Sequence, residues 1–421
     1  MGLFKQEYIE CQDRGYGHSD KYVSAECFPD DDYLKEYIRE NGTVGYCDFT
    51  EKNDEKVVPL EDLMSIIMKA VNIYYVKADG NVTWDSEEGY YDGHVIDRND
   101  IAYDILGGTG CDDKIISEIT KLMNDDLFTP ESQFITTVYE ESNKLWNEYC
   151  NDVFKCDISS EQIVKLCIEL KNGEDFENKV IADIADCLEM VILYIEKFNM
   201  TDTIFAPTGK SKGTKLYRCV NYLADKDFPF PLTYFPAMSI GSAPSKSTNA
   251  GRMNEKGDMI FYGSFSKAVA RIEVGSNSKH PEYPITEGCF VTNKDFKIVD
   301  LSKIDCTRCP SIFDIKHKDD RETWLFLRNF TNEISKPVND EKNYKPTQVL
   351  SKYIQRNTCY KGLEYRSAHK EGTGKKENNN VSLFIDHKDC LDRWEKPDAD
   401  ADQLIMISNA VQKPSKPLES L

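Results

Sequence analysis

The chain has 421 residues, with 52 Lys and Arg against 73 Asp and Glu, giving a formal net charge of −21. Hydrophobic residues make up 40% and aromatic residues 11% of it, which supports a packed core and excludes a wholly disordered chain. There is no cationic surplus to neutralise phosphates, so general nucleic-acid binding and binding to anionic membranes are also disfavoured. At this length we expect two domains.

The first residues and the cysteines bear on the compartment. No apolar run reaches the roughly 18 residues of a membrane span, and the start, MGLFKQEYIECQ, lacks the apolar core of a secretion signal. The 14 cysteines are scattered, and Cys306 and Cys309 alone form a C-x2-C pair, which supplies too few ligands for zinc. We therefore expect a cytoplasmic protein with reduced thiols and no bound metal.

The N-terminal half is predicted to be mostly helical. Apolar residues recur there every three or four positions, as on one helix face, in four segments: 61–75, 112–127, 161–171 and 179–198. Residues 77–100 instead resemble a loop or a short hairpin. The pattern predicts a helical N-terminal domain over residues 1–200.

The character of the chain changes near residue 201. Strand-like segments then predominate, at 258–265, 289–291, 297–301, 362–368 and 382–386. Helices are predicted at 264–273 and 347–357. We therefore predict an α+β domain over residues 201–395, followed by a polar tail, 396–421, that frays.

The charge changes near the same boundary. Residues 1–60 carry a net charge of −7, whereas residues 204–254 carry +5. A positive stretch in an acidic protein is either a solvated loop or a place where cations gather for an anionic ligand such as a pyrophosphate. Charge alone leaves both interpretations open.

One segment, residues 251–274, carries three side chains of complementary chemistry in the sequence GRMNEKGDMIFYGSFSKAVARIEV. Arg252 can clamp a phosphate with two parallel hydrogen bonds. Tyr262 can stack on a planar heterocycle, and Glu273 can stabilise a developing positive charge. Each also has an ordinary explanation: a surface charge, a core aromatic ring and an ion-pair partner.

Together with four further motifs, this segment resembles the RES-domain family over about residues 204–386. The motifs occur in order: LYR at 216–218, the GRxN…Y…E segment, PTQVLSKYI at 346–354, GLEYRSA at 362–368 and NNNVSLF at 378–384. An ordered set of this kind is far more specific than one short motif. The resemblance implies a fold similar to that of ADP-ribosyltransferases, with a central mixed sheet that binds NAD.

The resemblance also implies an activity and four catalytic residues. Characterised RES domains are toxins that cleave the nicotinamide–ribose bond of NAD by phosphorolysis or hydrolysis. By this resemblance Arg252 would bind phosphate and Tyr262 would contact the nicotinamide or its ribose. Glu273 would stabilise the oxocarbenium-like transition state or orient the attacking group, and Ser367 would hold the ribose or a phosphate.

Four more residues in the same motifs are assigned to NAD binding. Arg218 would bind the phosphates of NAD or an attacking inorganic phosphate, and Tyr217, Asn254 and Asn380 would complete the NAD site. The chemistry agrees with such a set, because nicotinamide leaves as a neutral base and needs no acid. What the reaction needs is a carboxylate near the ribosyl cation and firm anchoring of the phosphates.

The resemblance indicates which ligands and partners to expect, and it leaves alternative functions open. NAD is expected as substrate and inorganic phosphate as co-substrate, with an antitoxin or regulatory protein as partner and a homo-oligomer left open. Neither nucleic acid nor a membrane is expected. The expected role is the toxin of a bacterial toxin–antitoxin or defence system. An ADP-ribosyltransferase acting on a macromolecule and a non-catalytic nucleotide-binding module are the alternatives.

Residues 24–50 are similar to a HEPN/RES N-terminal domain, in which the matching segment carries two C-x2-C-like pairs. Here Cys27 and Cys47 are present, while Ser24 and Thr50 stand at their partners' positions. Two thiolates cannot close a tetrahedral zinc site.

Two questions about this domain stay open from the sequence. Cys11 or His18 could in principle complete a metal site with the two cysteines. No R-x4–6-H motif occurs, so a HEPN-type ribonuclease is not expected. The domain could sense substrate, bind a partner or restrain the C-terminal half.

Overall fold

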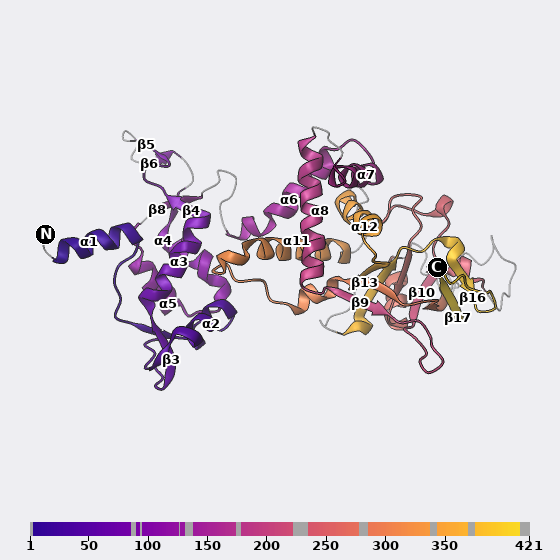
Figure 1. The fold of residues 1–421 in the computed structure, drawn as a ribbon, viewed down its shortest axis with the longest axis horizontal. Coiled ribbons are helices and arrows are strands. Elements are labelled where there is room, and N and C mark those ends of the chain that lie inside the picture. Colours follow the sequence, from indigo (N-terminus) through magenta and orange to yellow (C-terminus); the bar gives the residue numbers. More distant parts are fainter. Residues whose placement is uncertain are drawn as a thin grey trace, which may run out of the picture. The chain divides into compact units, whose positions relative to one another are not determined.

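The computed structural model describes ten stretches of the chain: residues 3–85, 90–92, 95–125, 127–130, 138–173, 178–221, 235–277, 285–336, 343–368 and 375–412. These form two compact units, whose elements are labelled in Figure 1. Unit 1 comprises residues 1–145 and 309–322, and unit 2 comprises residues 146–308 and 323–421. The change of composition near residue 201 lies inside unit 2, and the domain bounds inferred from it stay a prediction.

Unit 1 is mainly helical. Its helices are α1 (Leu3–Arg14), α2 (Asp32–Asn41), α3 (Leu60–Tyr74), α4 (Arg98–Leu106) and α5 (Asp113–Leu122), with the short turns η1 (Ala25–Cys27) and η2 (Gly107–Thr109). Within the described ranges its strands form three small sheets: β1 (Tyr22–Ser24), β3 (Glu55–Pro59) and β2 (Thr43–Gly45); β4 (Tyr75–Lys77), β8 (Leu127–Pro130) and β7 (Ile96–Asp97); β5 (Thr83–Asp85) and β6 (Tyr90–Asp92). Helix α6 (Val138–Lys155) spans the division between the units.

The sequence pattern anticipates much of unit 1. The helix predicted at 61–75 is α3, and the region predicted as a loop or short hairpin, 77–100, contains the paired strands β5 and β6 together with β7 and the start of α4. The helix predicted over 112–127 is shorter, because α5 ends at Leu122. There the chain turns to pair with the segment after α1, as Gly17 donates to the Leu122 carbonyl and Asn124 donates to the Gly15 carbonyl. Tertiary pairing therefore overrides the helical pattern.

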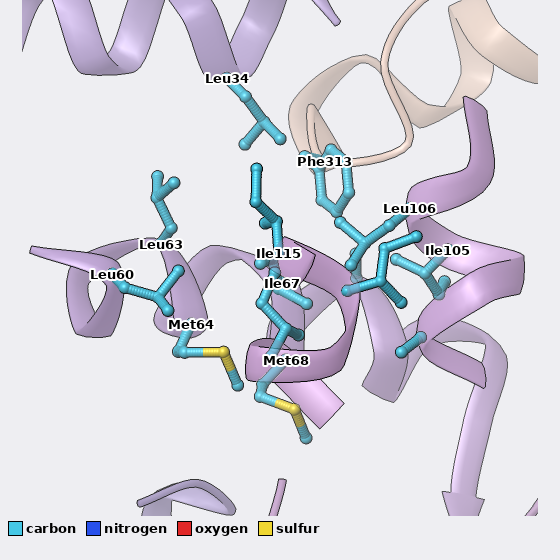
Figure 2. Close-up of a cluster of buried hydrophobic side chains, with 14 of the residues drawn as sticks. Leu34, Leu60, Leu63, Met64, Ile67, Met68, Ile105, Leu106, Ile115 and Phe313 are labelled. Atoms are coloured by element: carbon cyan, nitrogen blue, oxygen red, sulfur yellow. The ribbon is translucent and has the colours of Figure 1, made fainter. Parts of the chain in front are cut away.

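The core of unit 1 lies on the apolar face of α3. Leu63 and Ile67 are buried there together with Ile105 of α4 and Ile115 of α5. Figure 2 shows Phe313, from the distant segment 309–322, inserted among these side chains. Burying a side chain of this size stabilises a fold by about 1.5 to 3 kcal/mol. This cluster therefore explains why residues 309–322 fold with unit 1.

Unit 2 is built on a mixed sheet, nine-stranded within the described part of the chain. Its order is β16-β17-β12-β10-β11-β15-β14-β13-β9, with parallel pairing at β13–β14 and β16–β17. The strands are β9 (Thr201–Ile204), β10 (Leu216–Asn221), β11 (Phe261–Ser264), β12 (Ile285–Thr292), β13 (Phe296–Asp300), β14 (Gly362–Arg366), β15 (Asn379–Leu383), β16 (Cys390–Asp392) and β17 (Leu404–Gln412). The whole chain is α+β, as predicted.

Unit 2 also contains helices and short turns. The helices are α7 (Ser160–Lys171), α8 (Lys179–Lys197), α9 (Ala237–Ile240), α10 (Lys267–Asn277) and α12 (Lys345–Asn357), with short turns at η3 (Ser245–Ser247), η4 (Leu301–Cys306), η7 (Lys376–Asn378) and η8 (His387–Asp389). Helix α11 (Lys318–Ser335) begins in the 309–322 segment of unit 1, which also contains the short turn η5 (Ile315–His317), and continues into unit 2. Helix α12 is buried along most of its length and packs against α7 and α8. Within the described ranges, none of the helices combines the length and apolar character that crossing a bilayer demands.

Several predicted elements of unit 2 are shifted or wrong. The helix predicted at 264–273 is α10, which begins and ends about one turn later, and the strand predicted at 382–386 is β15, which begins three residues earlier. The strand predicted at 289–291 is the longer β12, which pairs with β10 and β17, and the strand predicted at 297–301 is β13, shifted by one residue. The prediction of a frayed tail is also wrong for β17, which pairs with β12 and β16 and buries Leu404 and Met406.

Buried carboxyl groups lie near the β14–β13–β9 edge of the sheet. Glu364, 1% exposed, accepts a hydrogen bond from Asn379 at 2.7 Å, and Asp300 lies directly opposite it on β13. Burial, together with the nearby Asp300 charge, raises the pKa of Glu364 to about 8. The Lys376 ammonium pairs with Asp202 and lies 3.9 Å from Glu364 Oε2. At neutral pH, Glu364 is therefore mainly protonated.

This shift predicts a pH-dependent stability. Between the ordinary Glu pKa near 4.5 and about 8, the folded state holds a proton that the unfolded state lacks, so the free energy of unfolding falls as pH rises. Glu364→Gln keeps the acceptor for Asn379 and should raise the free energy of unfolding at pH 8 by about 3 to 5 kcal/mol. Urea titrations should show this gain shrinking toward pH 5. The exposed Glu377→Gln serves as control, and a gain equal at both pH values would contradict the assignment.

Candidate active site

Four neighbouring strands of unit 2 turn a row of polar side chains to one face of the sheet. Residues that pair directly across strands share a face, and these pairs are Tyr217 with Ser264, Ser264 with Asn380, Asn380 with Tyr365, and Tyr262 with Ser382. The opposite face carries the apolar cluster of unit 2, which includes Leu216, Phe261, Val381 and Leu383. The two-residue period of the strands thus separates a polar face from the core.

Three of the predicted residues meet on this polar face. Ser367, directly after β14, donates from Oγ to Glu273 Oε1 at 2.5 Å, and Asn380 donates from Nδ2 to the same oxygen at 2.7 Å. Ser367 and Asn380 are both buried. We call Glu273, Ser367 and Asn380 the Glu273 cluster. Two donors on one oxygen hold the carboxylate in a single orientation over β14 and β15.

An ion-pair network anchors the helix that carries Glu273. Glu287 on β12 is 5% exposed, and its carboxylate pairs with Lys267 and Arg271 of α10. The Arg271 Nε–Glu287 Oε2 distance is 2.9 Å. Removing either partner of such a buried pair leaves an uncompensated charge, so the network fixes α10 on the sheet.

A second group of predicted residues lies around the Gly251–Asn254 turn. Gly251 and Asn254 exchange backbone hydrogen bonds, which closes a turn with Arg252 and Met253 at its tip. Asn254, 2% exposed, accepts a hydrogen bond from the Tyr262 hydroxyl at 2.7 Å. Its amide nitrogen donates to the Asn249 and Glu255 carbonyls. Gly251, Asn254 and Tyr262 form what we call the Asn254 cluster.

The two clusters are joined through Tyr365 and Ser382. Ser382 on β15 lies opposite Tyr262 on β11, and the Ser382 hydroxyl donates to the Tyr365 hydroxyl at 3.3 Å. Tyr365 lies opposite Asn380 of the Glu273 cluster. Burial raises the pKa of Tyr365 to about 12 and raises that of Tyr262 well above its ordinary value, so both phenols are neutral hydroxyl groups near pH 7.

The start of α12 holds the Gly251–Asn254 turn through hydrogen bonds to its backbone. Gln348 donates from Nε2 to the Gly251 and Asn254 carbonyls, each at 2.8 Å. Thr347 donates to the Arg252 carbonyl at 2.5 Å. The motif PTQVLSKYI at 346–354 does not by itself reveal this role, because the residues in contact are almost 100 positions apart in the chain.

Lys352, one turn further along α12, adds ion pairs to these hydrogen bonds. It is 5% exposed and pairs with Asp258 at 2.7 Å, Glu161 at 3.2 Å and Glu255 at 3.4 Å. Burial lowers the pKa of Lys352, but these carboxylates more than offset it and hold it above the ordinary value. Glu255 also accepts a hydrogen bond from the Ser160 backbone at the start of α7. The segment after the turn is therefore tied to two helices.

Arg252 projects from the tip of the turn. Its guanidinium lies over the Tyr344 ring, 4.9 Å from the centroid, and Nη1 is 3.9 Å from Glu333 Oε2. A guanidinium stacked on an aromatic ring keeps its in-plane N–H groups available for hydrogen bonds, and this geometry suits a phosphate. Neither contact joins Arg252 to the Glu273 cluster, so its phosphate-binding role stays a prediction.

Arg218 and Tyr217 lie on opposite faces of β10. Arg218 shares the core face with Leu216, where it donates to the Ile240 carbonyl at 2.7 Å and the Tyr262 carbonyl at 2.6 Å. These contacts tie α9 and β11 to β10. Tyr217 lies on the polar face opposite Ser264 and Cys289, and burial raises its pKa. The assignment of both residues to NAD binding stays a prediction.

Metal-ligand geometry is found away from these clusters. Among the described residues, one group of three His, Cys, Asp or Glu has mutually close ligand atoms: Asp202, Asp300 and Glu364. There the Lys376 ammonium pairs with Asp202, and burial raises the pKa of Glu364, so part of the negative charge of this group is offset. The +5 stretch is described only in part, because Asp225, Lys226 and Asp227 lie outside the described residues.

The chain matches two protein families. The match to HEPN/RES N-terminal domain 1 covers residues 40–158, and the match to the RES domain covers residues 215–404. No curated protein and no solved structure matches the chain. The second match contains both clusters and the whole of α12.

The packing of the turn predicts the effect of a methyl group. A Cβ at Gly251 would lie 2.5 Å from Asn254 Oδ1 and 3.2 Å from the Tyr262 hydroxyl, and Asn254 is held by three hydrogen bonds. Gly251→Ala should therefore lower the free energy of unfolding by about 1 to 3 kcal/mol in urea titrations. Gly209→Ala, where no atom lies within 4 Å of the added methyl, should change it by no more than about 0.5 kcal/mol. Equal effects of both substitutions would contradict this packing.

Proposed function

The chain belongs to the RES-domain proteins and carries a HEPN/RES N-terminal domain, and on that premise we propose that it cleaves the nicotinamide–ribose bond of NAD. The proposed biological role is that of a toxin in a bacterial toxin–antitoxin or defence system. The observation that carries the proposal is the Glu273 cluster, in which a carboxylate is held by two donors inside the RES-domain match.

The bond changes define what the protein must supply. The bond between ribose C1 and the pyridinium nitrogen breaks, and its electron pair neutralises the nicotinamide ring. Water or inorganic phosphate then donates an oxygen to C1, giving ADP-ribose or its 1-phosphate. Since the leaving group departs neutral, the reaction needs no proton donor. It needs, first, stabilisation of the cationic ribosyl centre and, second, firm anchoring of the phosphates.

Glu273 suits the first of these needs. Its carboxylate is fixed by Ser367 and Asn380, and its helix is fixed by the Glu287 network. A negative charge that is already oriented stabilises developing positive charge without reorganisation during the reaction. Ser367 and Asn380 thereby act on the reaction through Glu273, in addition to any contact that they make with the ribose.

The turn suits the second need, which is anchoring of the phosphates. Arg252 lies at its tip, and the stretch around it carries the excess of positive charge. Because Gln348 and Thr347 hold three carbonyls of the turn, the arginine starts from a fixed backbone. Fixed anchoring of a remote group is what converts binding energy into rate.

The test is incubation of purified protein with NAD, with and without phosphate, followed by chromatography of the products. Nicotinamide with phosphorylated ADP-ribose indicates phosphorolysis, and nicotinamide with free ADP-ribose indicates hydrolysis. ADP-ribose attached to protein or nucleic acid would instead identify a transferase. Absence of nicotinamide under every condition would refute the proposal for this chain.

Two substitutions test the assignment of Glu273 and Arg252 to the active site. Glu273→Gln and Arg252→Ala should each reduce nicotinamide release by at least about 100- to 1,000-fold, as for loss of a group that stabilises transition-state charge. Thermal unfolding should confirm that both variants fold. Glu169→Gln, a carboxylate change on α7, is the matched control and should retain full activity. Wild-type rates in both variants would refute the site.

The hydrogen bonds from Gln348 to the turn predict a further effect on turnover, separate from the effects of Glu273 and Arg252. Gln348→Met preserves the side-chain volume but removes the donor to Gly251 and Asn254, so the turn should loosen and kcat/KM for NAD should fall about tenfold or more. Ser351→Ala on the same helix removes a buried hydroxyl that makes no hydrogen bond, and should leave kcat/KM unchanged. Equal kcat/KM in the two folded variants would contradict a positioning role for Gln348.

A further inference from the structure

Two buried thiols of unit 1 lie in contact. Cys27 Sγ and Cys47 Sγ are 3.5 Å apart, although the residues are 20 positions apart in the sequence. Cys27 is 4% exposed and Cys47 is fully buried. A disulfide needs a sulfur–sulfur distance near 2.05 Å, so the two sulfurs must approach by about 1.5 Å. Movement of this size is within the reach of side-chain rotation.

The neighbours of the two sulfurs are hydrogen-bonding groups. The Thr50 backbone N–H donates to Cys47 Sγ at 3.5 Å, and Ser24 Oγ lies 3.9 Å from Cys27 Sγ. The four positions Ser24, Cys27, Cys47 and Thr50 thus converge in space, with hydroxyl groups in two of them. Neutral hydroxyls are poor zinc ligands beside two thiols, which favours covalent chemistry of the thiols themselves.

The two thiols differ in reactivity. Burial raises the pKa of Cys47, but hydrogen bonds from Thr50 and Ser24 outweigh it and leave the pKa below its ordinary value. Burial raises the pKa of Cys27 to about 12. Since the thiolate is the nucleophile, this difference in pKa favours Cys47 as the attacking group and Cys27 as the resolving group.

Both thiols are held by local backbone structure. Cys27 ends the turn η1, and the Cys47 carbonyl accepts a hydrogen bond from Glu51 at 3.0 Å. The Cys47 N–H donates to the Lys52 carbonyl, also at 3.0 Å. Short turns of this kind fix where each sulfur lies. The chain between the two residues contains α2 and β2.

We propose that Cys27 and Cys47 are a thiol–disulfide site of unit 1, oxidised by a small peroxide. The Cys47 thiolate attacks one peroxide oxygen, the O–O bond breaks, and the departing hydroxide takes a proton to become water. The Cys27 sulfur then attacks the Cys47 sulfenic acid, the S–O bond breaks, and a second water leaves with the thiol proton. The pair loses two electrons and two protons, and hydrogen peroxide is reduced to two waters. The disulfide links η1 to the turn after β2 and closes a loop around α2.

The test is titration of the reduced full-length chain with hydrogen peroxide, followed by blocking of free thiols in denaturant and peptide mass spectrometry. The expected product is a cross-linked peptide pair containing Cys27 and Cys47, 2 Da lighter than the reduced pair and restored by dithiothreitol. Metal analysis of the reduced chain should give less than 0.1 zinc per chain.

Controls make either result decisive. The exposed Cys359 reports whether peroxide has reacted, and Cys359→Ser should leave the cross-link unchanged. In Cys27→Ser, Cys47 should accumulate a sulfenic acid that dimedone captures. If Cys359 is oxidised while Cys27 and Cys47 are both recovered as free thiols, the proposal is wrong. One zinc per chain that is lost in Cys47→Ser would also overturn it.

Discussion

The contact between α12 and the Gly251–Asn254 turn is the constraint on which the candidate site depends. Three backbone carbonyls of the turn accept hydrogen bonds from only two side chains of one helix. Because α12 is itself buried on most sides, the turn takes its position from the core of unit 2. Asn254 transmits this order to Tyr262 on β11. The backbone of the turn is thereby held in place by a buried helix.

Buried charges determine how the helices lie on the sheet. Lys352 holds α12 to α7 and to the segment after the turn, while Glu287 holds α10 to β12. In each case one buried charge is shared between several partly exposed partners of opposite sign, which reduces the cost of removing it from water. The net charge of −21 conceals this local balance. The two helices that carry or position the candidate residues are both placed by ion pairs.

Local patterns predicted the helices well and the long-range contacts poorly. The periodicity of apolar residues located α3, α7 and α8, because each buries one continuous stripe. The order of the strands could not be read in this way, since pairing joins segments far apart in the chain. The strand β17 was missed because its apolar run lies between polar, proline-containing segments.

The candidate residues show the same difference between local patterns and long-range contacts. The RES-like motifs assigned Glu273, Ser367 and Asn380 to one site, and the three side chains are hydrogen-bonded in the structure, although their spacing in the sequence does not reveal these bonds. The supporting residues Gln348 and Glu287 were not singled out, because their partners are distant in sequence. For Arg218 the sequence does indicate the orientation, because strand alternation places it on the same face of β10 as Leu216, which is the core face.

The position of β17 has a consequence for synthesis of the protein. This strand lies between β16 and β12, inside the sheet, yet it is the last element of the described chain to be translated. Until residue 412 has emerged from the ribosome, β12 has an unpaired edge and β16 has no neighbour. The sheet that presents Glu273 and Tyr262 is therefore completed only after residue 412 has been translated. A shorter nascent chain lacks the finished sheet on which the candidate site rests, and it exposes the edge of β12.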